Sequence, residues 1–522
     1  MSATVTRTVG SIVGGRTRED APGGRLESTN PAQLSEVVAD VALGDAGTFV
    51  DACRAAKAAQ PAWAAVPAPV RGRVIAQVGR LVEENFEGLA QLVRAEVGKP
   101  IAEARGEVQE IVDTCHCFLG EGRRLYGQTV PSEMPDKQLF TFRMPVGVAA
   151  IVTAGNFPVA VPSWYLVPAL LCGNAVVWKP AEYAPALGDA LARILIAGGL
   201  PDGVLNVVQA SGEATFAGLS TALDERLVDK VGFTGSSAVG SEIGALCGRH
   251  LQSPCLELGG KNPLVVMEDA ELELAVEGAL FSGFGTAGQR CTSLGCVIVH
   301  ESVHDEFVAR LDAALRAAPV GDPAQDVLFG PMLGERFATR FEEEWLGLVE
   351  PHHTVHGSSA TGRITTGSPR EGFVGGDPSE GLFMHPTLVT GVRREDALYD
   401  TETFGPMVGV LSFSTFDEAV ELANGHGYGL SAAIYTTSPA HALRFRERVS
   451  AGMLSVNNST SGAEAHLPFG GNGRSGNGSR QSGIWVLDQF TRWQSMNWDY
   501  SGRLQKAQMD VVAPEGDPGF RL

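Results

Sequence analysis

Two segments of the sequence carry residues that could form or cleave a covalent bond. The stretch GTAGQRCTS (285–293) places Cys291 beside Arg290, and a cysteine is a nucleophile only where its surroundings favour the thiolate or supply a base. The stretch LELGGKNP (256–263) places Glu257 between two leucines, as a paired surface charge or as a general base. Taken alone, the second pattern favours a surface charge. The first leaves open whether Cys291 only fills the core.

Two glycine patterns compete as a nucleotide-binding turn. GNGRSG (471–476) matches G-x-G-x-x-G, but it does not open a helix, so we reject it as a dinucleotide fingerprint. In FTGSSAVGSEIG, the residues Gly235, Ser236 and Gly240 lie between a predicted strand and a predicted helix. They could form the turn and helix N-terminus that bind a pyrophosphate, and a purely structural turn is the alternative.

A lysine–glutamate pair, Lys179 and Glu182 in VVWKPAEYAP, follows another predicted strand. Nucleotides bind at the carboxyl ends of strands in open α/β sheets. A carboxylate there can accept both hydroxyls of a ribose and would repel a 2′-phosphate. Two solvated charges in a turn are the alternative interpretation.

The elements that must position these residues are predicted by the hydrophobic pattern. After residue 145, short β-branched runs alternate with helical stretches, which predicts an α/β fold with parallel sheets. A second α/β sheet is predicted from about 262–269 onward. The predicted strands are 146–152, 175–180, 203–208, 227–233, 262–267 and 406–413, and the predicted helices are 161–173, 184–199, 214–223, 271–285 and 415–425.

Other segments differ from this alternation. The first 130 residues are predicted to be mainly helical, as at 51–66 and 105–125. Residues 137–144 and 492–501 are predicted to form a small projecting sheet that could serve in assembly. Residues 351–381 are predicted to be a long exposed loop, and we expect its three histidines to be solvated rather than metal ligands. These are His352, His353 and His356.

Composition excludes several classes of protein. The chain has 522 residues, 44% hydrophobic and 19% charged, which is typical of a compact soluble protein of two or three domains. Its net charge of -20 argues against nonspecific nucleic-acid binding and against docking on an anionic membrane. The uncharged stretch 144–178 contains four prolines, which favours buried α/β segments over a membrane span.

The eight cysteines show no paired framework and no Cys-x-x-Cys motif. They therefore predict neither a disulfide scaffold nor a metal site. The N-terminus lacks the apolar core of a signal peptide, so a reducing cytoplasm is the expected location.

Seven short motifs together resemble those of the aldehyde dehydrogenase superfamily, in the order and approximate spacing of that family. The resemblance extends from about residue 10 to 510. The motifs are NFP (156–158), KPAE (179–182), FTGS (233–236), LELGGK (256–261), GQRC (288–291), ETFGP (402–406) and PFGG (468–471).

The resemblance implies a domain organisation, a cofactor and an assembly. It implies a Rossmann-like cofactor domain, an α/β catalytic domain and a β hairpin for oligomerisation in a homodimer or homotetramer. The cofactor implied is NAD rather than NADP, and the substrate is a small aldehyde. The implied domains are 1–132 with 146–265 for NAD binding, 266–488 for catalysis, and 133–145 with 489–510 for oligomerisation.

The resemblance also implies roles for individual residues. Cys291 matches the nucleophile, and its backbone N–H with the Asn156 side chain would hold the oxyanion. Glu257 would activate the water that hydrolyses the thioester. Glu402 and Phe404 match residues that hold the nicotinamide ribose and ring. The remaining cysteines, including Cys296, match no catalytic position.

A narrower resemblance is to the antiquitin subfamily, the α-aminoadipic semialdehyde dehydrogenases. It rests on GEVQEIVDTC (106–115), NFPVAVPSW (156–164), TAGQRCTS (286–293), HESVHDEF (300–307) and TSGAE (460–464). Leu294 and Gly295 depart from the basic residues that the subfamily tends to carry. The substrate residues implied are Arg290, Gly462 and Ala463 for the carboxylate, Glu110 for the amine, and Trp164 and Phe469 as aromatic walls.

Three other functions compete with this one. The enzyme could act on another semialdehyde or on an aromatic aldehyde. A CoA-acylating dehydrogenase is disfavoured, because it has no need of the carboxylate that Glu257 supplies. A non-catalytic binding or structural relative is disfavoured by the joint presence of Cys291, Glu257 and Asn156.

Overall fold

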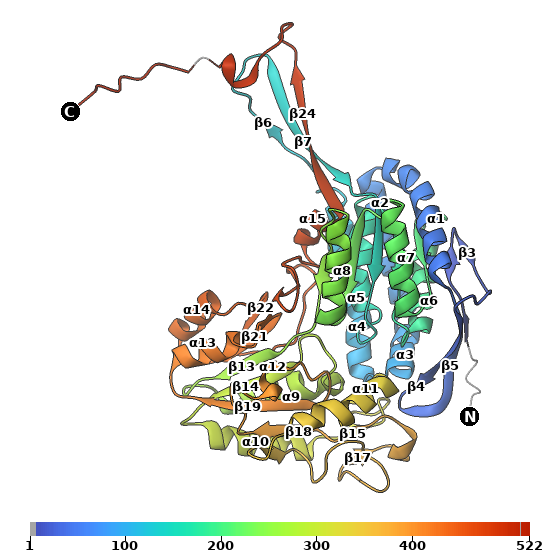
Figure 1. The fold of residues 1–522 in the computed structure, drawn as a ribbon, viewed down its shortest axis with the longest axis vertical. Coiled ribbons are helices and arrows are strands. Elements are labelled where there is room, and N and C mark those ends of the chain that lie inside the picture. Colours follow the sequence, from blue (N-terminus) through green and yellow to red (C-terminus); the bar gives the residue numbers. More distant parts are fainter. Residues whose placement is uncertain (1–6, 512) are drawn as a thin grey trace.

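The computed structural model describes residues 7–511 and 513–522, and two large sheets dominate it (Figure 1). The first sheet has the strand order β12-β11-β8-β9-β10-β2-β3 and is parallel from β12 to β10. Its parallel strands are buried, as expected for a sheet covered by helices on both faces. They are β8 (Val148–Val152), β9 (Ala175–Lys179), β10 (Leu205–Val207), β11 (Lys230–Thr234) and β12 (Cys255–Glu257).

Helices connect these strands in the predicted places. The apolar stretch 144–178 folds as strand, helix and strand, which confirms the α/β interpretation. No helix among the described residues is long and apolar enough to cross a membrane. The connecting helices are α5 (Ala160–Leu171), α6 (Pro185–Ala197), α7 (Gly212–Asp224) and α8 (Ser237–Arg249).

The second sheet has the order β16-β18-β19-β14-β13-β21-β22 and is parallel except for β16. The chain enters it at Asn262, within the range of about 262–269 predicted for the change of sheet, and the domain boundary predicted after residue 265 lies inside β13. Its strands are β13 (Asn262–Val266), β14 (Leu294–His300), β16 (Thr354–His356), β18 (Thr387–Thr390), β19 (Met407–Phe413), β21 (Ser431–Tyr435) and β22 (Met453–Val456). Its main helices are α9 (Leu272–Phe284), α10 (His304–Ala317), α13 (Phe416–Asn424) and α14 (Pro439–Arg448).

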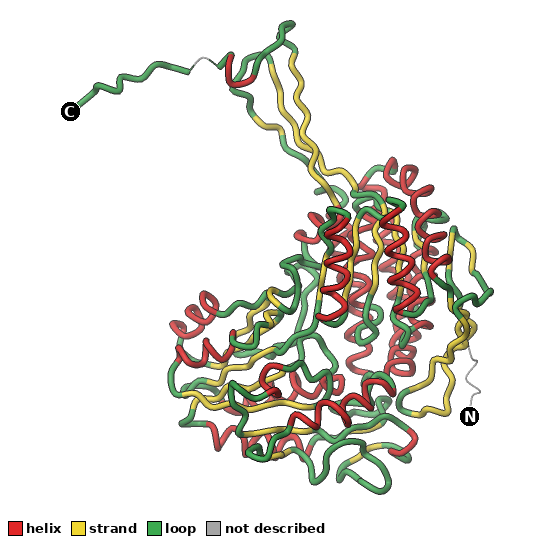
Figure 2. Tube along the Cα trace, in the orientation of Figure 1, coloured by secondary structure: helices red, strands yellow, loops and turns green. Residues whose placement is uncertain are grey.

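A three-stranded antiparallel sheet projects from the body, as predicted (Figures 1 and 2). It consists of β6 (Thr129–Val130), β7 (Lys137–Pro145) and β24 (Thr491–Asp499). The register pairs Thr491 with Pro145 and Asp499 with Lys137, so two segments far apart in sequence form one ribbon. β24 is an edge strand and carries exposed aromatic side chains.

The N-terminal region differs from the prediction. Residues 7–43 form strands rather than helices, because short strands add to the first sheet and to a separate three-stranded sheet. These strands are β1 (Arg7–Val9), β2 (Ile12–Val13), β3 (Arg16–Thr17), β4 (Gly24–Asn30) and β5 (Gln33–Leu43). Helices then follow as predicted: α1 (Ala46–Ala65), α2 (Ala68–Glu84), α3 (Phe86–Val97) and α4 (Ile101–Glu121).

The segment 351–381 is mostly loop, as predicted, but it is not wholly exposed. Its strand β16 extends the second sheet, and the side chain of His353 is fully buried. His353 Nδ1 accepts the Glu350 backbone N–H, so Nε2 carries the proton that it donates to Asp396 at 2.9 Å. A metal ligand would have to lose that proton. His353 therefore fits a structural hydrogen bond better than a metal site.

Short elements complete the fold and lie mostly around the second sheet. They are β15 (Val320–Gly321), β17 (Phe373–Val374), β20 (Tyr428–Gly429), β23 (Asn472–Gly473), α11 (Glu335–Arg340), α12 (Ala397–Asp400) and α15 (Leu487–Phe490). The rejected glycine pattern 471–476 contains β23 and opens no helix, as expected.

Candidate active site

The loop that precedes Cys291 has an unusual backbone. After α9, three consecutive residues adopt left-handed conformations, with φ of 53° at Thr286, 52° at Ala287 and 68° at Gly288. Each of the two non-glycine residues costs about 1–2 kcal/mol in this conformation. The surroundings must therefore hold this nucleophile loop, residues 285–293, in place.

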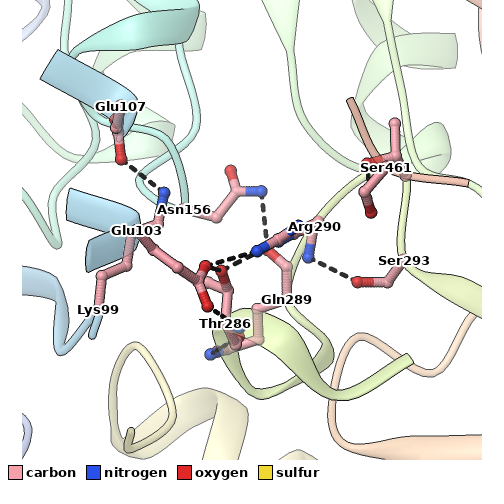
Figure 3. Close-up of polar contacts among 10 residues, drawn as sticks. Lys99, Glu103, Glu107, Asn156, Thr286, Gln289, Arg290, Ser293 and Ser461 are labelled. Atoms are coloured by element: carbon pink, nitrogen blue, oxygen red, sulfur yellow. Dashed lines mark hydrogen bonds and ion pairs between the residues drawn. The ribbon is translucent and has the colours of Figure 1, made fainter. Parts of the chain in front are cut away.

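Contacts from two sides hold the nucleophile loop. From α4, Glu103 accepts hydrogen bonds from the Thr286 backbone N–H at 3.1 Å and from the Thr286 hydroxyl, and it pairs with Arg290 at 2.6 Å (Figure 3). From β13, the Asn262 amide donates to the carbonyl oxygens of Cys291 at 2.8 Å and Ser293 at 2.7 Å. The loop that carries Cys291 is thus fixed on both sides of the thiol.

Glu257 and Cys291 interact at the junction of the two sheets. Glu257 ends β12 and is fully buried, and neither carboxylate oxygen has a hydrogen-bond partner among the described residues. Burial raises the pKa of Glu257 to about 8, against a lowering by the Cys291 thiol. Burial and Glu257 hold the pKa of the Cys291 thiol well above its usual range. A proton acceptor thus lies beside a thiol, not at the surface.

Asn156 reaches the same loop from the first sheet. It follows β8, is buried, and donates its side-chain amide to the Gln289 carbonyl oxygen at 2.9 Å (Figure 3). Asn156 therefore contacts a residue of the nucleophile loop that lies two positions before Cys291. The second N–H of the amide can serve another acceptor.

A buried ion pair supports the Asn156 loop. Lys99 and Glu107 lie 2.5 Å apart with both side chains buried, and the Lys99 ammonium lies 3.3 Å above the Phe157 ring. Glu107 also accepts the backbone N–H groups of Val159 at 2.9 Å and Ala160 at 3.3 Å. The pair thus fixes the segment that immediately follows Asn156.

Three predicted cofactor residues lie at the carboxyl edge of the first sheet. Lys179 ends β9, is buried, and lies 3.5 Å from the Glu182 carboxylate, whose side chain is 37% exposed. Burial lowers the pKa of Lys179 and Glu182 opposes that shift. Ser236 caps α8, a 13-residue helix that begins directly after β11. The strand, turn and helix context predicted for this segment is confirmed.

The glycines near α8 have identifiable packing roles. A side chain at Gly240 would meet Leu258 at 2.3 Å, so Gly240 lets α8 pack on the chain after β12. A side chain at Gly235 would meet the ring of Phe233 at 2.5 Å. Gly235 therefore serves the structural turn and Gly240 the packing of α8, and pyrophosphate binding here remains a prediction.

Glu402 lies beside the glycines of LELGGK. The Glu402 carboxylate accepts the Gly260 backbone N–H at 3.0 Å, and a side chain at Gly259 would collide with it at 2.0 Å. Burial raises the pKa of Glu402 to about 7. Phe404 packs against Phe337 with ring centroids 5.8 Å apart.

Glu110 and Ala463, predicted to contact the amine and the carboxylate of one substrate head group, line the same pocket of about 420 Å³. One oxygen of Glu110 is buried and has no hydrogen-bond partner among the described residues. Burial and Glu107 raise the pKa of Glu110 to about 8, although Lys99 and Trp164 oppose this. Asp113, Glu464, His116 and His466 are among the other lining residues.

The aromatic pair and the TSGAE segment adjoin these residues. Trp164 and Phe469 are buried, with ring centroids 4.6 Å apart. The Thr460 hydroxyl donates to the Thr292 carbonyl oxygen at 2.8 Å, which ties the segment to the nucleophile loop. Gly462 has a φ of +132°, and a side chain added there would meet open space.

Arg290 does not line the 420 Å³ pocket. Its guanidinium pairs with Glu103 and lies 4.4 Å above the Phe281 ring, and it is not among the residues that line the pocket. Its charge is therefore already balanced by a carboxylate of this chain. Contact with a substrate carboxylate remains a prediction for Arg290.

Sequence reasoning missed Lys99, Glu103, Glu107 and Thr286. Residues 103, 107 and 110 are spaced by four and three, so they share one face of α4. That spacing was the available signal, but it is equally typical of a solvated helix face. Only the packing of α4 against the Asn156 loop and the nucleophile loop distinguishes a face that supports the site from a solvated face.

Comparison with known proteins identifies the chain. The model of the aldehyde dehydrogenase family matches residues 18–496. The chain belongs to the aldehyde dehydrogenase family. Oxidation of aldehydes with NAD is the reaction of this family, so the protein is an oxidoreductase that acts on a small aldehyde.

Relatives of this aldehyde dehydrogenase cover nearly the whole chain. The alpha-ketoglutarate semialdehyde dehydrogenase of Haloferax volcanii is 39% identical over 90% of this chain and 94% of its own. The alpha-aminoadipic semialdehyde dehydrogenase of Bos taurus is 37% identical over 93% of this chain and 88% of its own. The structure of betaine aldehyde dehydrogenase from Staphylococcus aureus, in complex with NAD+, superposes with a TM-score of 0.89 at 27% identity, covering 95% of this chain and 96% of that one.

Proposed function

We propose that this aldehyde dehydrogenase uses NAD to oxidise an amino-acid semialdehyde, with α-aminoadipic semialdehyde as the first choice, to its carboxylic acid. The observation that supports this substrate is the position of the Glu110 carboxyl group. One of its oxygens is buried without a hydrogen-bond partner among the described residues, and Glu110 lines one pocket with Ala463. A buried carboxylate without a partner is costly, and a substrate ammonium would neutralise it.

The residues at the first sheet fit NAD. Lys179 and Glu182 would hold the adenine-side ribose, the N-terminus of α8 at Ser236 would face the pyrophosphate, and Glu402 would hold the second ribose. Bound there, NAD would accept the hydride that the aldehyde carbon loses. In this proposal the first sheet and its helices form the cofactor domain and the second sheet the catalytic domain.

The first half of the reaction uses Cys291 and Asn156. The Cys291 sulfur attacks the aldehyde carbon as the thiol proton passes to solvent, which reaches this half-buried side chain. The carbonyl oxygen becomes an oxyanion, which the free N–H of the Asn156 amide and the Cys291 backbone N–H stabilise. Loss of hydride then leaves a thioester on Cys291.

The second half uses Glu257. A carboxylate with a pKa of about 8 is a stronger base than an ordinary glutamate, and it lies beside the thioester sulfur. It takes a proton from water, the resulting hydroxide adds to the thioester carbon, and the Cys291 thiolate leaves. The carboxylic acid product is released.

Substrate selection depends on opposite charges at the two ends of a head group. Glu110 would bind the substrate ammonium, and the backbone of Gly462 and Ala463 would bind its carboxylate. Trp164 and Phe469 would line the apolar part of the substrate. The acidic character of the pocket, with Asp113 and Glu464 also lining it, favours a cationic amine.

A 2-oxo semialdehyde is the second candidate substrate. The Haloferax volcanii relative is named for such an aldehyde. A protonated Glu110 can donate a hydrogen bond to a keto oxygen, and its pKa of about 8 keeps a proton available at neutral pH. The two substrates therefore require opposite protonation states of one side chain.

We also propose that the chain assembles into a homodimer or homotetramer in a reducing cytoplasm. The exposed edge strand β24, with Trp493 and Trp498 more than half exposed, supports assembly through residues 133–145 and 489–510. The cysteines support a reducing compartment, because all eight are free thiols.

A panel of aldehydes tests the substrate assignment. We expect kcat/KM with NAD to be highest for α-aminoadipic semialdehyde, lower for α-ketoglutarate semialdehyde, and lowest for benzaldehyde and propanal. Cys291→Ala should abolish turnover of all of them while NAD still binds, and Cys296→Ala should remain active. A preference for benzaldehyde or propanal would contradict the proposed substrate.

A further inference from the structure

Helix α4 contacts three separate parts of the active site through three acids on one face. Glu110 lines the substrate pocket, Glu107 accepts the backbone N–H groups that follow Asn156, and Glu103 accepts from the nucleophile loop. Of the three, Glu103 is the one whose contacts lie nearest to Cys291 in sequence.

Glu103 makes its contacts with both ends of the turn that leads to Cys291. One oxygen accepts the Thr286 backbone N–H at 3.1 Å, and the other accepts the Thr286 hydroxyl and the Arg290 guanidinium at 2.6 Å (Figure 3). The Thr286 hydroxyl also accepts from Arg290 Nε at 3.1 Å. One carboxylate thus closes a ring of hydrogen bonds across residues 286–290.

The backbone between these contacts needs such support. Thr286 and Ala287 hold left-handed conformations that their side chains disfavour, and they persist only where the surroundings determine them. Burial alone would raise the pKa of Glu103, but Arg290, Thr286 and Lys99 hold it below its usual value. The carboxylate is therefore ionised and accepts all of these hydrogen bonds.

We propose that Glu103 is a positioning residue of the dehydrogenase reaction, which orients the Cys291 thiol and backbone N–H by fixing Thr286 and Arg290. The proposal rests on Cys291 being the nucleophile. It gives Arg290 a role that is independent of any carboxylate on the substrate, because Arg290 is the residue immediately before Cys291 and its guanidinium pairs with Glu103.

The variant Glu103→Gln tests this role, since it keeps the shape and removes the charge. A buried charged hydrogen bond and a misplaced reacting group each change rates by about ten- to a hundredfold. We expect kcat to fall by that factor, with KM for the aldehyde changed less than about threefold. The loss should be equal for propanal and for α-aminoadipic semialdehyde, because positioning does not depend on the head group.

The matched control is Glu87→Gln. Glu87 forms the same kind of ion pair with Arg105 at 3.0 Å, but both side chains are about half exposed and lie on the outer surface of α3 and α4. We expect this variant to keep the wild-type kcat. If Glu103→Gln fails to fold, Thr286→Ala removes one of the three contacts and should lower kcat by a smaller factor, about three- to tenfold.

Alkylation of Cys291 gives a readout that does not require turnover. The rate of iodoacetamide labelling, followed by mass spectrometry over a pH series, should change in Glu103→Gln at Cys291 and stay unchanged at Cys117, a half-buried thiol on α4. If labelling Cys291 of the wild-type protein left turnover intact, the nucleophile assignment itself would fail, and that result differs from any result for Glu103.

Three results would overturn the positioning role. One is a normal kcat and a normal labelling rate in Glu103→Gln. Another is a loss of thermal stability with unchanged kcat, which would mark a purely structural ion pair. The third is a loss confined to substrates that carry a carboxylate, which would make the Arg290 pair a substrate contact.

Discussion

The Asn156 side-chain amide donates a hydrogen bond of 2.9 Å to the carbonyl oxygen of Gln289. This bond joins the loop after β8, in the first sheet, to the loop that carries Cys291. It uses one of the two amide hydrogens and leaves the other for the oxyanion.

Replacing Asn156 by Ala should therefore remove both the proposed oxyanion donor and the hydrogen bond between the loop after β8 and the nucleophile loop. Removal of one oxyanion donor typically lowers kcat by 100- to 1,000-fold, and we expect a loss of about that size with a smaller change in KM. Steady-state kinetics with propanal and NAD would measure it. A loss of less than about threefold would show that Asn156 is not an oxyanion donor.

Cofactor choice should depend on Glu182. Its carboxylate would meet the 2′-phosphate of NADP as a like charge, and such juxtapositions cost several kcal/mol. We expect the wild-type protein to bind NAD more tightly than NADP. The variant Glu182→Gln should reduce the ratio of the two dissociation constants, NADP over NAD, at least tenfold. Titration calorimetry with both cofactors measures this, with the exposed Glu225→Gln as the control. Equal affinities in wild type would contradict the ribose assignment.

Substrate recognition should depend on the protonation state of Glu110. Its pKa of about 8 lies above that of an ordinary glutamate, so the carboxylate form, which an ammonium needs, becomes dominant only above that pH. KM for α-aminoadipic semialdehyde should therefore fall as pH rises toward 8. A 2-oxo substrate, which accepts from the protonated form, should show the opposite trend.

The variant Glu110→Gln tests whether the ionised carboxylate binds the substrate ammonium. We expect kcat/KM for the amino semialdehyde to fall by about ten- to a hundredfold, the value of a buried charged hydrogen bond. Activity with propanal should stay within about threefold and serves as the internal control. Equal losses on both aldehydes would remove Glu110 from substrate recognition.

Assembly should depend on the exposed side chains of β24. Light scattering should give the wild-type protein a mass of at least twice the 54.9 kDa chain. A charge at Trp498, which is 56% exposed on the edge strand, should shift the Trp498→Asp variant toward the monomer. The exposed Leu251, outside this sheet, should tolerate Asp without any change in mass. An unchanged mass for Trp498→Asp would place the interface elsewhere.

The strands and helices of both sheets could be predicted because their hydrophobic periods are set locally. β8, α5 and β9 follow directly from an uncharged stretch in which prolines and glycines disfavour one continuous helix. The strands β1, β2 and β3 could not, because two- and three-residue strands have no period of their own and form only against a neighbour. The longer strands β4 and β5 were missed because the whole N-terminal region was predicted to be mainly helical. The change of sheet near Asn262 was predicted correctly, because the apolar strand 262–267 follows the glycines of LELGGK and begins a new alternation of strand and helix.

The chemistry of the candidate site was partly predictable from motifs, but its supporting charges were not. Glu107 and Lys99 are separated by eight residues, and nothing in that spacing distinguishes a buried ion pair from two surface charges. The same holds for His353, expected in solvent and found buried against Asp396. Burial of these groups depends on contacts between elements that are distant in sequence.

In the proposed reaction, Cys291 carries the substrate as a thioester, and water hydrolyses this thioester only with Glu257 as the base. Because Glu257 acts as a base when ionised, and its pKa is raised to about 8, turnover limited by hydrolysis should rise with pH and level off above 8. Glu257→Gln should lose this pH dependence together with steady-state turnover.

Single-turnover mixing of Glu257→Gln with NAD and aldehyde tests this claim most directly. We expect one equivalent of NADH per chain, then a stall, and an acyl mass on Cys291 in the intact and digested protein. Absence of the NADH burst would mean that Glu257 is needed before hydride transfer, and an acyl mass on any other residue would contradict Cys291 as the nucleophile.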